Sequence, residues 1–323
     1  MLPTLLGVAL IVFVLLRVVP GDPVAMMISP GASAADIRAL HAHYGLDKPI
    51  LMQLLIWFGA MLHGDLGQSI TSRIGVAGLV LRRLPATIEL VLLATLIALI
   101  LGSALALLGA AFRRTALDWL VDGAIAVTLA IPDFVWGLLF ILLFDVMFPI
   151  LPVSGRIDPS ITVHFATNFY LIESLLTWHF PVAGGLLSHA ILPSTALALP
   201  FAAVFARVLK TSLGDAEHQD YVQMARARGY SRARVLLAEA LPNAIIPTAS
   251  LTGVQITFML AGTVLVERVF SYEGIGSMAI DAVTNRDLPL IQGIILAFAV
   301  MFVAINLAVD IGLTFLDPRL RHG

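Results

Sequence analysis

The sequence contains no cysteine and only two lysines, Lys48 and Lys210. Without cysteine, the chain has no disulfide, no thiol catalysis and no cysteine-ligated metal site. The lysines also exclude the phosphate-binding loop Gly-x4-Gly-Lys-Ser/Thr. Lys48 is followed by Pro49, where the motif needs serine or threonine. Before Lys210, Val204 and Leu209 occupy the two positions where the motif needs glycine. The chain therefore hydrolyses no ATP by this mechanism.

Charged residues and enzyme motifs are scarce as well. Only 12% of the residues are charged, whereas soluble domains carry about 25%. The net charge of −2 gives no reason to expect nucleic-acid binding. The eight histidines never form a His-Glu-x-x-His zinc motif, and no Gly-x-Ser-x-Gly hydrolase elbow is present. We expect no metal site and no catalytic residue on this chain.

Hydrophobic residues make up 59% of the 323-residue chain, and its mean hydropathy is +0.96. These values are typical of a membrane protein, and a membrane-crossing helix needs roughly 20 apolar residues. The apolar runs predict an all-α integral membrane protein with six transmembrane helices. We place them at 1–19, 86–112, 119–148, 186–210, 244–266 and 288–311.

The first of these runs is short, because only 16 residues precede Arg17 and none of them is basic. One hypothesis is that the native chain starts further upstream. The alternative is a short, tilted helix whose Arg17 side chain extends to the membrane surface.

The distribution of arginine and lysine predicts how the spans are oriented. On one side lie the basic link after the second span, the basic loop 211–243 and the tail 316–323. The opposite loops are poorer in basic residues, although Arg82 and Arg83 lie close to a span there. We therefore expect both termini to be cytoplasmic and the segment 20–85 to be external.

Within 20–85, helix start and stop signals predict two short helices. One lies between Ser33 and Gly45, and the other runs from Pro49 to Gly64. The second has apolar residues at helical spacing but is too short to cross a membrane. We expect it to be amphipathic, lying on the outer membrane surface or on a partner, with ordinary packing as the alternative.

The loop 211–243 is polar, basic and long. Asp220 and Gln223 have the spacing of a capping pair, and Gly229 suits the left-handed residue that ends a helix. Ser231 is placed to cap a second helix, which Pro242 would interrupt before the next span. Such a protruding element fits a groove on another protein. A solvated basic loop is the alternative reading.

Family resemblance favours the docking element. The string Gln223-Met224-Ala225-x3-Gly229-x9-Glu239-Ala240-Leu241-Pro242 resembles the EAA loop of ABC-type import permeases. Gln223, Met224 and Glu239 depart from the usual pattern, but Asp-Tyr-Val-Gln-Met-Ala-Arg-Ala-Arg-Gly at 220–229 is similar to the form found in the dipeptide/oligopeptide permease family. Other strings resemble this family in the same order along the chain: Pro20-Gly21-Asp22-Pro23, Gly64-Asp65-Leu66-Gly67, Leu84-Pro85-Ala86-Thr87, Phe270-Ser271-Tyr272-Glu273-Gly274-Ile275-Gly276, Arg286-Asp287-x-Pro289 and Asp317-Pro318-Arg319.

The resemblance implies a type I ABC importer permease fold over residues 86–315, in a bacterial inner membrane. The implied function is ATP-driven, binding-protein-dependent import of dipeptides or oligopeptides, with nickel, glutathione or sugars as alternative solutes. The implied partners are membrane lipid, a second homologous permease, two ATP-binding subunits that use the ATP, and an external solute-binding protein. The implied ATPase-docking residues are Asp220, Tyr221, Val222, Gln223, Ala225, Arg226, Ala227, Arg228 and Gly229.

Asp133, which follows Pro132 in the third span, is the central carboxylate of the predicted helices. A charge there costs about 2.5–3.5 kcal/mol on insertion scales. Either Asp133 lines a translocation path, or it caps a helix that restarts after the proline. An ion-gradient-driven transporter would need further mid-membrane ion-binding groups, and a membrane-embedded enzyme would need converging polar groups. The sequence shows neither set.

Overall fold

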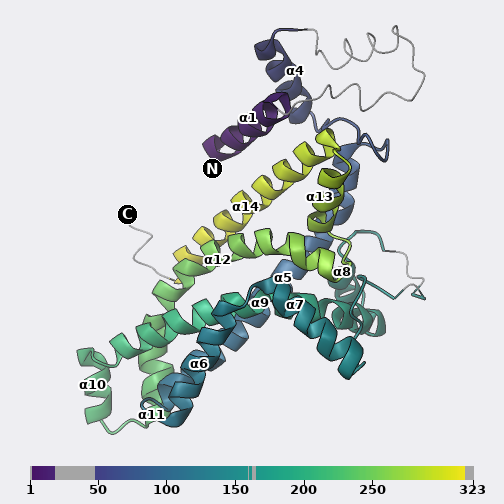
Figure 1. Cartoon of the computed structure of the whole chain (residues 1–323). Coiled ribbons are helices and arrows are strands. Elements are labelled where there is room, and N and C mark those ends of the chain that lie inside the picture. Colours follow the sequence, from purple (N-terminus) through teal and green to yellow (C-terminus); the bar gives the residue numbers. More distant parts are fainter. Residues whose placement is uncertain (1, 19–47, 159, 162–164, 317–323) are drawn as a thin grey trace. The chain divides into compact units, whose positions relative to one another are not determined.

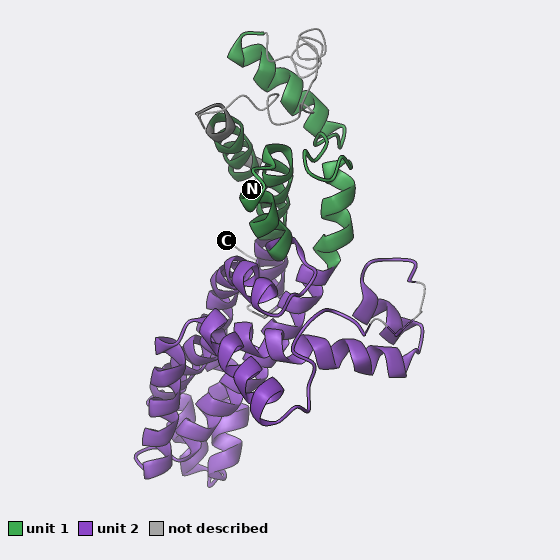
Figure 2. Cartoon of the chain, turned by 45° about the vertical axis from the view of Figure 1, so that its right-hand side comes forward, with its two compact units in different colours: residues 1–85, 277–303 green, residues 86–276, 304–323 purple. Residues whose placement is uncertain are grey.

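The computed structural model describes residues 2–18, 48–158, 160–161 and 165–316 (Figure 1). These residues form helices and no strands, and their single β contact is an isolated bridge between Gln68 and Gly75. The chain divides into two compact units (Figure 2). Unit 1 comprises residues 1–85 and 277–303, and unit 2 comprises residues 86–276 and 304–323. The all-α prediction is confirmed.

Among the described residues, four helical segments are long and apolar enough to cross a membrane. They are α5 (Val76–Ala111), α9 (Phe180–Ala216), the run Arg232–Val269 and α14 (Leu288–Leu316). The predicted third span corresponds to two helices, α6 (Ala116–Ala130) and Asp133–Met147, which form a further candidate span only if they are taken together, because they meet at a bend of 99°. The second half of this span consists of α7 (Asp133–Ile141) and the π-helical η1 (Leu142–Met147).

The first predicted span corresponds to α1 (Leu2–Val18), which has 17 residues. This length is at the lower end of what crosses a bilayer, so the count of six stays a prediction. Helix α5 starts at Val76, well before the predicted residue 86, and passes through Pro85. Helix α9 likewise extends beyond the predicted 186–210 at both ends and contains Pro193 and Pro200.

In unit 1, the short helix expected before Gly64 is α4 (Ile50–Leu62), none of whose residues is buried. Phe13 of α1 contacts Trp57 of α4, with ring centroids 5.7 Å apart. The helix expected between Ser33 and Gly45 lies outside the described residues, as do residues 317–323 of the tail.

The fully buried Asp287 joins two segments of unit 1 that are far apart in sequence. Its Oδ2 accepts hydrogen bonds from the Ser69 hydroxyl (2.5 Å) and the Thr71 N–H (3.0 Å). Its Oδ1 accepts the Leu290 N–H at 3.2 Å in the first turn of α14. One carboxylate therefore caps α14 and also holds the turn that precedes α5.

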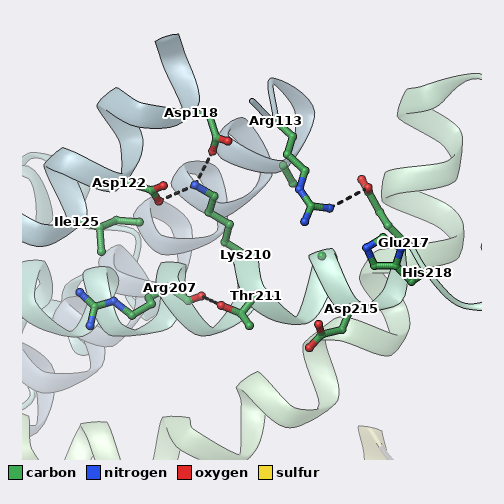
Figure 3. A pocket seen from close by; sticks show the side chains of 12 residues that line it. Arg113, Asp118, Asp122, Ile125, Arg207, Lys210, Thr211, Asp215, Glu217 and His218 are labelled. Atoms are coloured by element: carbon green, nitrogen blue, oxygen red, sulfur yellow. Dashed lines mark hydrogen bonds and ion pairs between the residues drawn. The ribbon is translucent and has the colours of Figure 1, made fainter. Parts of the chain in front are cut away.

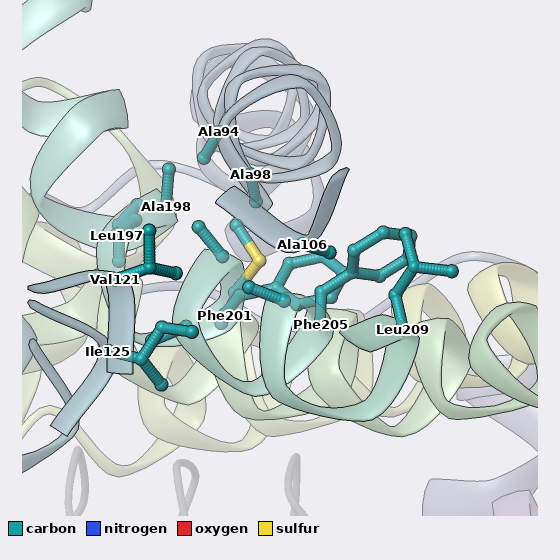
Figure 4. Close-up of a cluster of buried hydrophobic side chains, with 14 of the residues drawn as sticks. Ala94, Ala98, Ala106, Val121, Ile125, Leu197, Ala198, Phe201, Phe205 and Leu209 are labelled. Carbon is teal, nitrogen blue, oxygen red and sulfur yellow. The ribbon is translucent and has the colours of Figure 1, made fainter. Parts of the chain in front are cut away.

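In unit 2, α9 is the central helix and packs against α6, α7, α8 (Tyr170–Leu176) and α12 (Leu241–Val269). Small residues face one another where α5 approaches α9 (Figure 4). A Cβ added to Gly102 would lie 2.8 Å from the Ala202 carbonyl oxygen. Such close contact is typical of membrane helices, where small residues let backbones approach. The buried residues that line this contact include Ala94, Ala98, Ala106, Ala198, Ala202 and Ala206.

A buried polar group of unit 2 centres on Glu267, near the end of α12. Its carboxylate accepts the Thr87 hydroxyl at 2.6 Å, and the Thr87 oxygen accepts the Ile275 N–H at 2.9 Å. Ile275 opens α13 (Ile275–Thr284), and any Cβ at Gly274 would collide with the Glu267 carboxylate. The string Phe-Ser-Tyr-Glu-Gly-Ile-Gly therefore folds closely around Glu267.

Candidate functional site

The predicted docking element forms a short helix, α10 (Asp220–Ala227), that lies beside α11 (Arg232–Arg234) at one end of unit 2 (Figure 1). The N-cap of α10 is Gln219, and no side chain caps its first turn. The predicted Asp220–Gln223 capping pair is therefore wrong. Asp220 is instead the first residue of the helix, and the Gln223 amide donates to the His218 carbonyl oxygen at 3.2 Å. An acidic residue in the first turn still favours the helix through its dipole.

Gly229 ends α10 as predicted. Its φ is +79°, the left-handed conformation that glycine adopts without a steric cost. The Gly229 N–H donates to the Arg226 carbonyl oxygen at 2.9 Å, and the Tyr230 N–H donates to the Ala225 carbonyl oxygen at 3.3 Å. These two bonds form a Schellman motif. The requirement for glycine comes from the backbone alone, because nothing lies within 4 Å of an added Cβ.

Helix α10 has one buried face and one exposed face. Val222 is 0% exposed and Ala225 is 4% exposed, so these two residues attach the helix to the rest of unit 2. The remaining predicted docking residues are exposed: Asp220, Tyr221, Gln223, Arg226, Ala227, Arg228 and Gly229. Tyr221 and the neighbouring Met224 are large apolar side chains at 39% and 56% exposure. An exposed apolar pair within a basic surface suits contact with a partner protein.

The second arm of the loop starts at Ser231, which the sequence predicts as a cap. The Ser231 Oγ accepts the Arg234 N–H at 3.4 Å, which confirms this prediction. The predicted interruption at Pro242 is wrong, because the helical run continues from Arg232 to Val269. Pro242 lies in the first turn of α12, directly after the π-helical η2 (Val235–Ala240). Pro242 has no N–H to donate to the preceding turn, and this break in the hydrogen-bond ladder coincides with the π-helical η2.

Charged side chains surround a cavity of about 560 Å³ next to this element (Figure 3). Lys210 of α9 lies between two carboxylates of α6, with its Nζ 2.5 Å from both Asp118 Oδ1 and Asp122 Oδ1. Across the cavity, Glu217 pairs with Arg113 at 3.2 Å. These ion pairs connect the ends of α6 and α9 with the turn after α5.

Asp133 opens α7 at the bend that follows α6, with Pro132 as the N-cap. Its Oδ1 accepts the Phe134 N–H at 2.7 Å, a bond that satisfies one free donor of the helix start. Its carboxylate also lies against Gly262 of α12, where an added Cβ would collide with it. Among the described residues, no group of three or more His, Cys, Asp or Glu is arranged to hold a metal ion.

The buried pairs of unit 2 were not predicted from the sequence. Glu89 of α5 is almost completely buried and pairs with Arg156. The partners are 67 residues apart, so no local spacing reveals the pair. The only signal in the sequence was a single arginine in the segment between the predicted third and fourth spans.

Comparison with known proteins identifies the class of the chain. Residues 98–322 match the family "Binding-protein-dependent transport system inner membrane component", and residues 2–91 match the corresponding N-terminal family. The chain is 39% identical to the "Di/tripeptide transport system permease protein DppB" of Pseudomonas aeruginosa, over 100% of this chain and 96% of that one. It is 35% identical to the "Dipeptide transport system permease protein DppB" of Escherichia coli K12, over 99% and 96%.

Two solved structures share the fold. One is an amino acid ABC transporter, with a TM-score of 0.50 and 18% identity over 73% of this chain and 94% of that one. The other is the MetNI methionine ABC transporter in inward-facing conformations, with a TM-score of 0.52 and 14% identity over 74% and 96%. The chain thus has the fold of an ABC transporter membrane subunit. It belongs to the family of inner membrane components of binding-protein-dependent transport systems. The predicted family is confirmed, and the chain is a transport subunit.

Proposed function

We propose that this chain is a permease subunit of an ATP-driven importer for dipeptides or oligopeptides, and that α10 docks an ATPase subunit in the cytoplasm. The observation that carries the docking role is the geometry of α10, with two residues buried against unit 2 and the others exposed. The peptide substrate is supported by the names of the relatives that match over nearly the whole chain. The alternatives are nickel, glutathione and sugars.

The proposed assembly contains a second homologous permease, two ATP-binding subunits and an external solute-binding protein. ATP-driven closure of the two ATPases would move α10 and switch the spans between outward-facing and inward-facing states, a two-state equilibrium biased by ligands on each side. Both termini and α10 would then lie in the cytoplasm. This chain binds no cofactor in the proposal, because the partner subunits use the ATP.

Reconstitution of the complete transporter in liposomes tests this function. We expect uptake of a labelled dipeptide that requires ATP and the binding protein. A Gly229→Asp variant should lose both ATPase association and uptake, because it adds a negative charge at the C-terminal end of α10, where the helix dipole disfavours an anion. Intact association and uptake in this variant would contradict the docking role. Mass spectrometry of the ligand carried by the binding protein would decide between peptide and the alternative solutes.

Asp133 is the proposed contact with the translocation path. The support is its half-buried carboxylate at the break of a span, beside a glycine of α12. Asp133→Asn keeps an acceptor for the Phe134 N–H and removes the charge, so it should slow uptake without lowering stability. Normal uptake by Asp133→Ala together with lower thermal stability would show that the side chain only caps α7.

A further inference from the structure

Glu217 forms ion pairs with two arginines that come from different parts of unit 2. Its Oε2 atom lies 3.2 Å from the Arg113 Nη1 atom and 3.4 Å from the Arg226 Nη2 atom. Arg113 belongs to the turn between α5 and α6, and Arg226 belongs to the last turn of α10. A single oxygen atom therefore joins α10 to the end of α5.

The position of Glu217 in its own helix does not explain this carboxylate. Glu217 is the C-cap of α9, where the negative end of the helix dipole disfavours an anion. The two guanidinium groups offset this repulsion. The Glu217 side chain is only 19% exposed, compared with 40% for Arg113 and 51% for Arg226. The carboxylate is therefore the shielded centre of the cluster, and the arginines reach it from the surface.

A second polar contact reaches the same place. Arg232, in the second arm of the loop, donates to the Ala110 carbonyl oxygen at 3.4 Å, in the last turn of α5. One arm of the docking element thus reaches the α5–α6 turn through Glu217, and the other contacts the end of α5 directly. The buried Val222 and Ala225 also hold α10 in place, but apolar contacts permit sliding. The contacts with the shared carboxylate depend on distance and direction. If α10 moved while the α5–α6 turn stayed in place, Glu217 would lose its contact with one of the two arginines.

We propose that Glu217 is a positioning residue that transmits the displacement of α10 to the α5–α6 turn. Closure of the ATPases would pull α10, the Arg226–Glu217–Arg113 link would pull the turn, and α5 and α6 would follow. This inference rests on the proposed docking of an ATPase at α10. It adds that Glu217 acts after docking, so association and transmission are separable.

The test measures labelled dipeptide taken up per ATP hydrolysed by the reconstituted full transporter. Glu217→Gln keeps the size of the side chain and removes its charge. We expect ATPase association to stay unchanged and uptake per ATP to fall between about twofold and thirtyfold, the range of coupling changes seen for single substitutions. The double variant Arg113→Gln/Arg226→Gln should show the same fall, and adding Glu217→Gln to it should cause no further change. Glu217→Asp, which keeps the charge, should recover part of the ratio.

Asp215→Asn is the matched control. Asp215 lies on the same last turn of α9 and lines the same cavity, but its carboxylate points away from the cluster (Figure 3). It should leave uptake per ATP unchanged. An unchanged ratio in Glu217→Gln, or loss of ATPase association in that variant, would overturn the transmission role. Absence of association already in the unsubstituted transporter would instead contradict docking itself, so the two failures are distinguishable.

Discussion

The Arg156 guanidinium lies 2.8 Å from the Glu89 carboxylate, and the two side chains are only 7% and 3% exposed. Arg156 also donates to the Asn168 carbonyl oxygen at 2.6 Å, and its guanidinium lies over the Tyr170 ring. The other Glu89 oxygen accepts the Ile172 N–H at 3.0 Å. This ion pair therefore holds the loop around α8 against α5.

Removing one partner of this pair should strongly destabilise the chain, because the remaining charge is buried and unpaired. We expect Glu89→Gln to lower the free energy of unfolding by about 3–5 kcal/mol, as for other buried pairs. Thermal unfolding in detergent measures the effect. The double variant Glu89→Leu/Arg156→Met should recover much of the loss. The exposed Asp145→Asn serves as a control and should change little; equal stability of Glu89→Gln and Asp145→Asn would contradict the buried pair.

Gly102→Ala should weaken the contact between α5 and α9. The added Cβ would meet the Ala202 carbonyl oxygen at 2.8 Å and the Phe205 ring at 3.0 Å. Overpacking of this kind costs about 1–3 kcal/mol. The control is Gly184→Ala in α9, an exposed helical position with nothing within 4 Å. Alanine favours a helix over glycine by up to about 1 kcal/mol, so the two melting temperatures should move in opposite directions. A shift in the same direction would be inconsistent with the close contact.

Tyr272 makes the stability of the chain sensitive to alkaline pH. Burial, together with nearby Glu89 and Glu267, raises the pKa of Tyr272 from 10.0 to about 12, although Arg156 acts against this shift. Because the folded-state pKa is higher, the unfolded chain loses the proton first. The stabilisation is thus complete below pH 10.0 and is lost as the pH rises through about 12. At 1.36 kcal/mol per pKa unit the loss approaches about 3 kcal/mol.

The free energy of unfolding, measured from about pH 9 to about pH 12, checks this prediction, because this range covers the loss of the Tyr272 stabilisation. The Tyr272→Phe variant lacks the ionisable group and should lose less stability across the window than the unsubstituted chain. Parallel losses in the two proteins would show that another group is responsible.

The ATPase association of Gly229 variants should follow how readily the new residue adopts the left-handed conformation. Asparagine visits this conformation readily, whereas alanine pays about 1–2 kcal/mol. No clash adds to this cost, because the space around an added Cβ is open. We therefore expect Gly229→Asn to retain more ATPase association than Gly229→Ala, measured by co-purification. The reverse order would mean that the turn geometry does not control docking.

Local signals in the sequence predicted the parts of the fold that are set by neighbouring residues. The helix before Gly64, the end of α10 at Gly229 and the cap at Ser231 all depend on residues within one turn. Pro85 and Pro242 were misleading for the same reason. A local pattern treats proline as a helix boundary, whereas tertiary packing carries α5 and α12 past these positions.

The polar network of unit 2 could not be predicted, because its partners are far apart in sequence. Thr87 and Glu267 are separated by 180 residues, and Arg113 and Glu217 by 104. Periodicity identifies which residues face a core, but it does not pair charges on different helices. The proposed docking residues could be named from the sequence only because they form one continuous string.

The absence of cysteine permits the most direct test of docking at α10. A single cysteine introduced as Met224→Cys would lie on the exposed face of α10, where Met224 is 56% exposed. A cysteine introduced as Leu176→Cys would lie at the end of α8, where Leu176 is 74% exposed. Each variant is assembled with its ATPase subunits and treated with a thiol-to-amine cross-linker. We predict a cross-link from Met224→Cys to an ATPase subunit and none from Leu176→Cys. No cross-link at residue 224, or equal cross-linking at both positions, would contradict the proposed docking site.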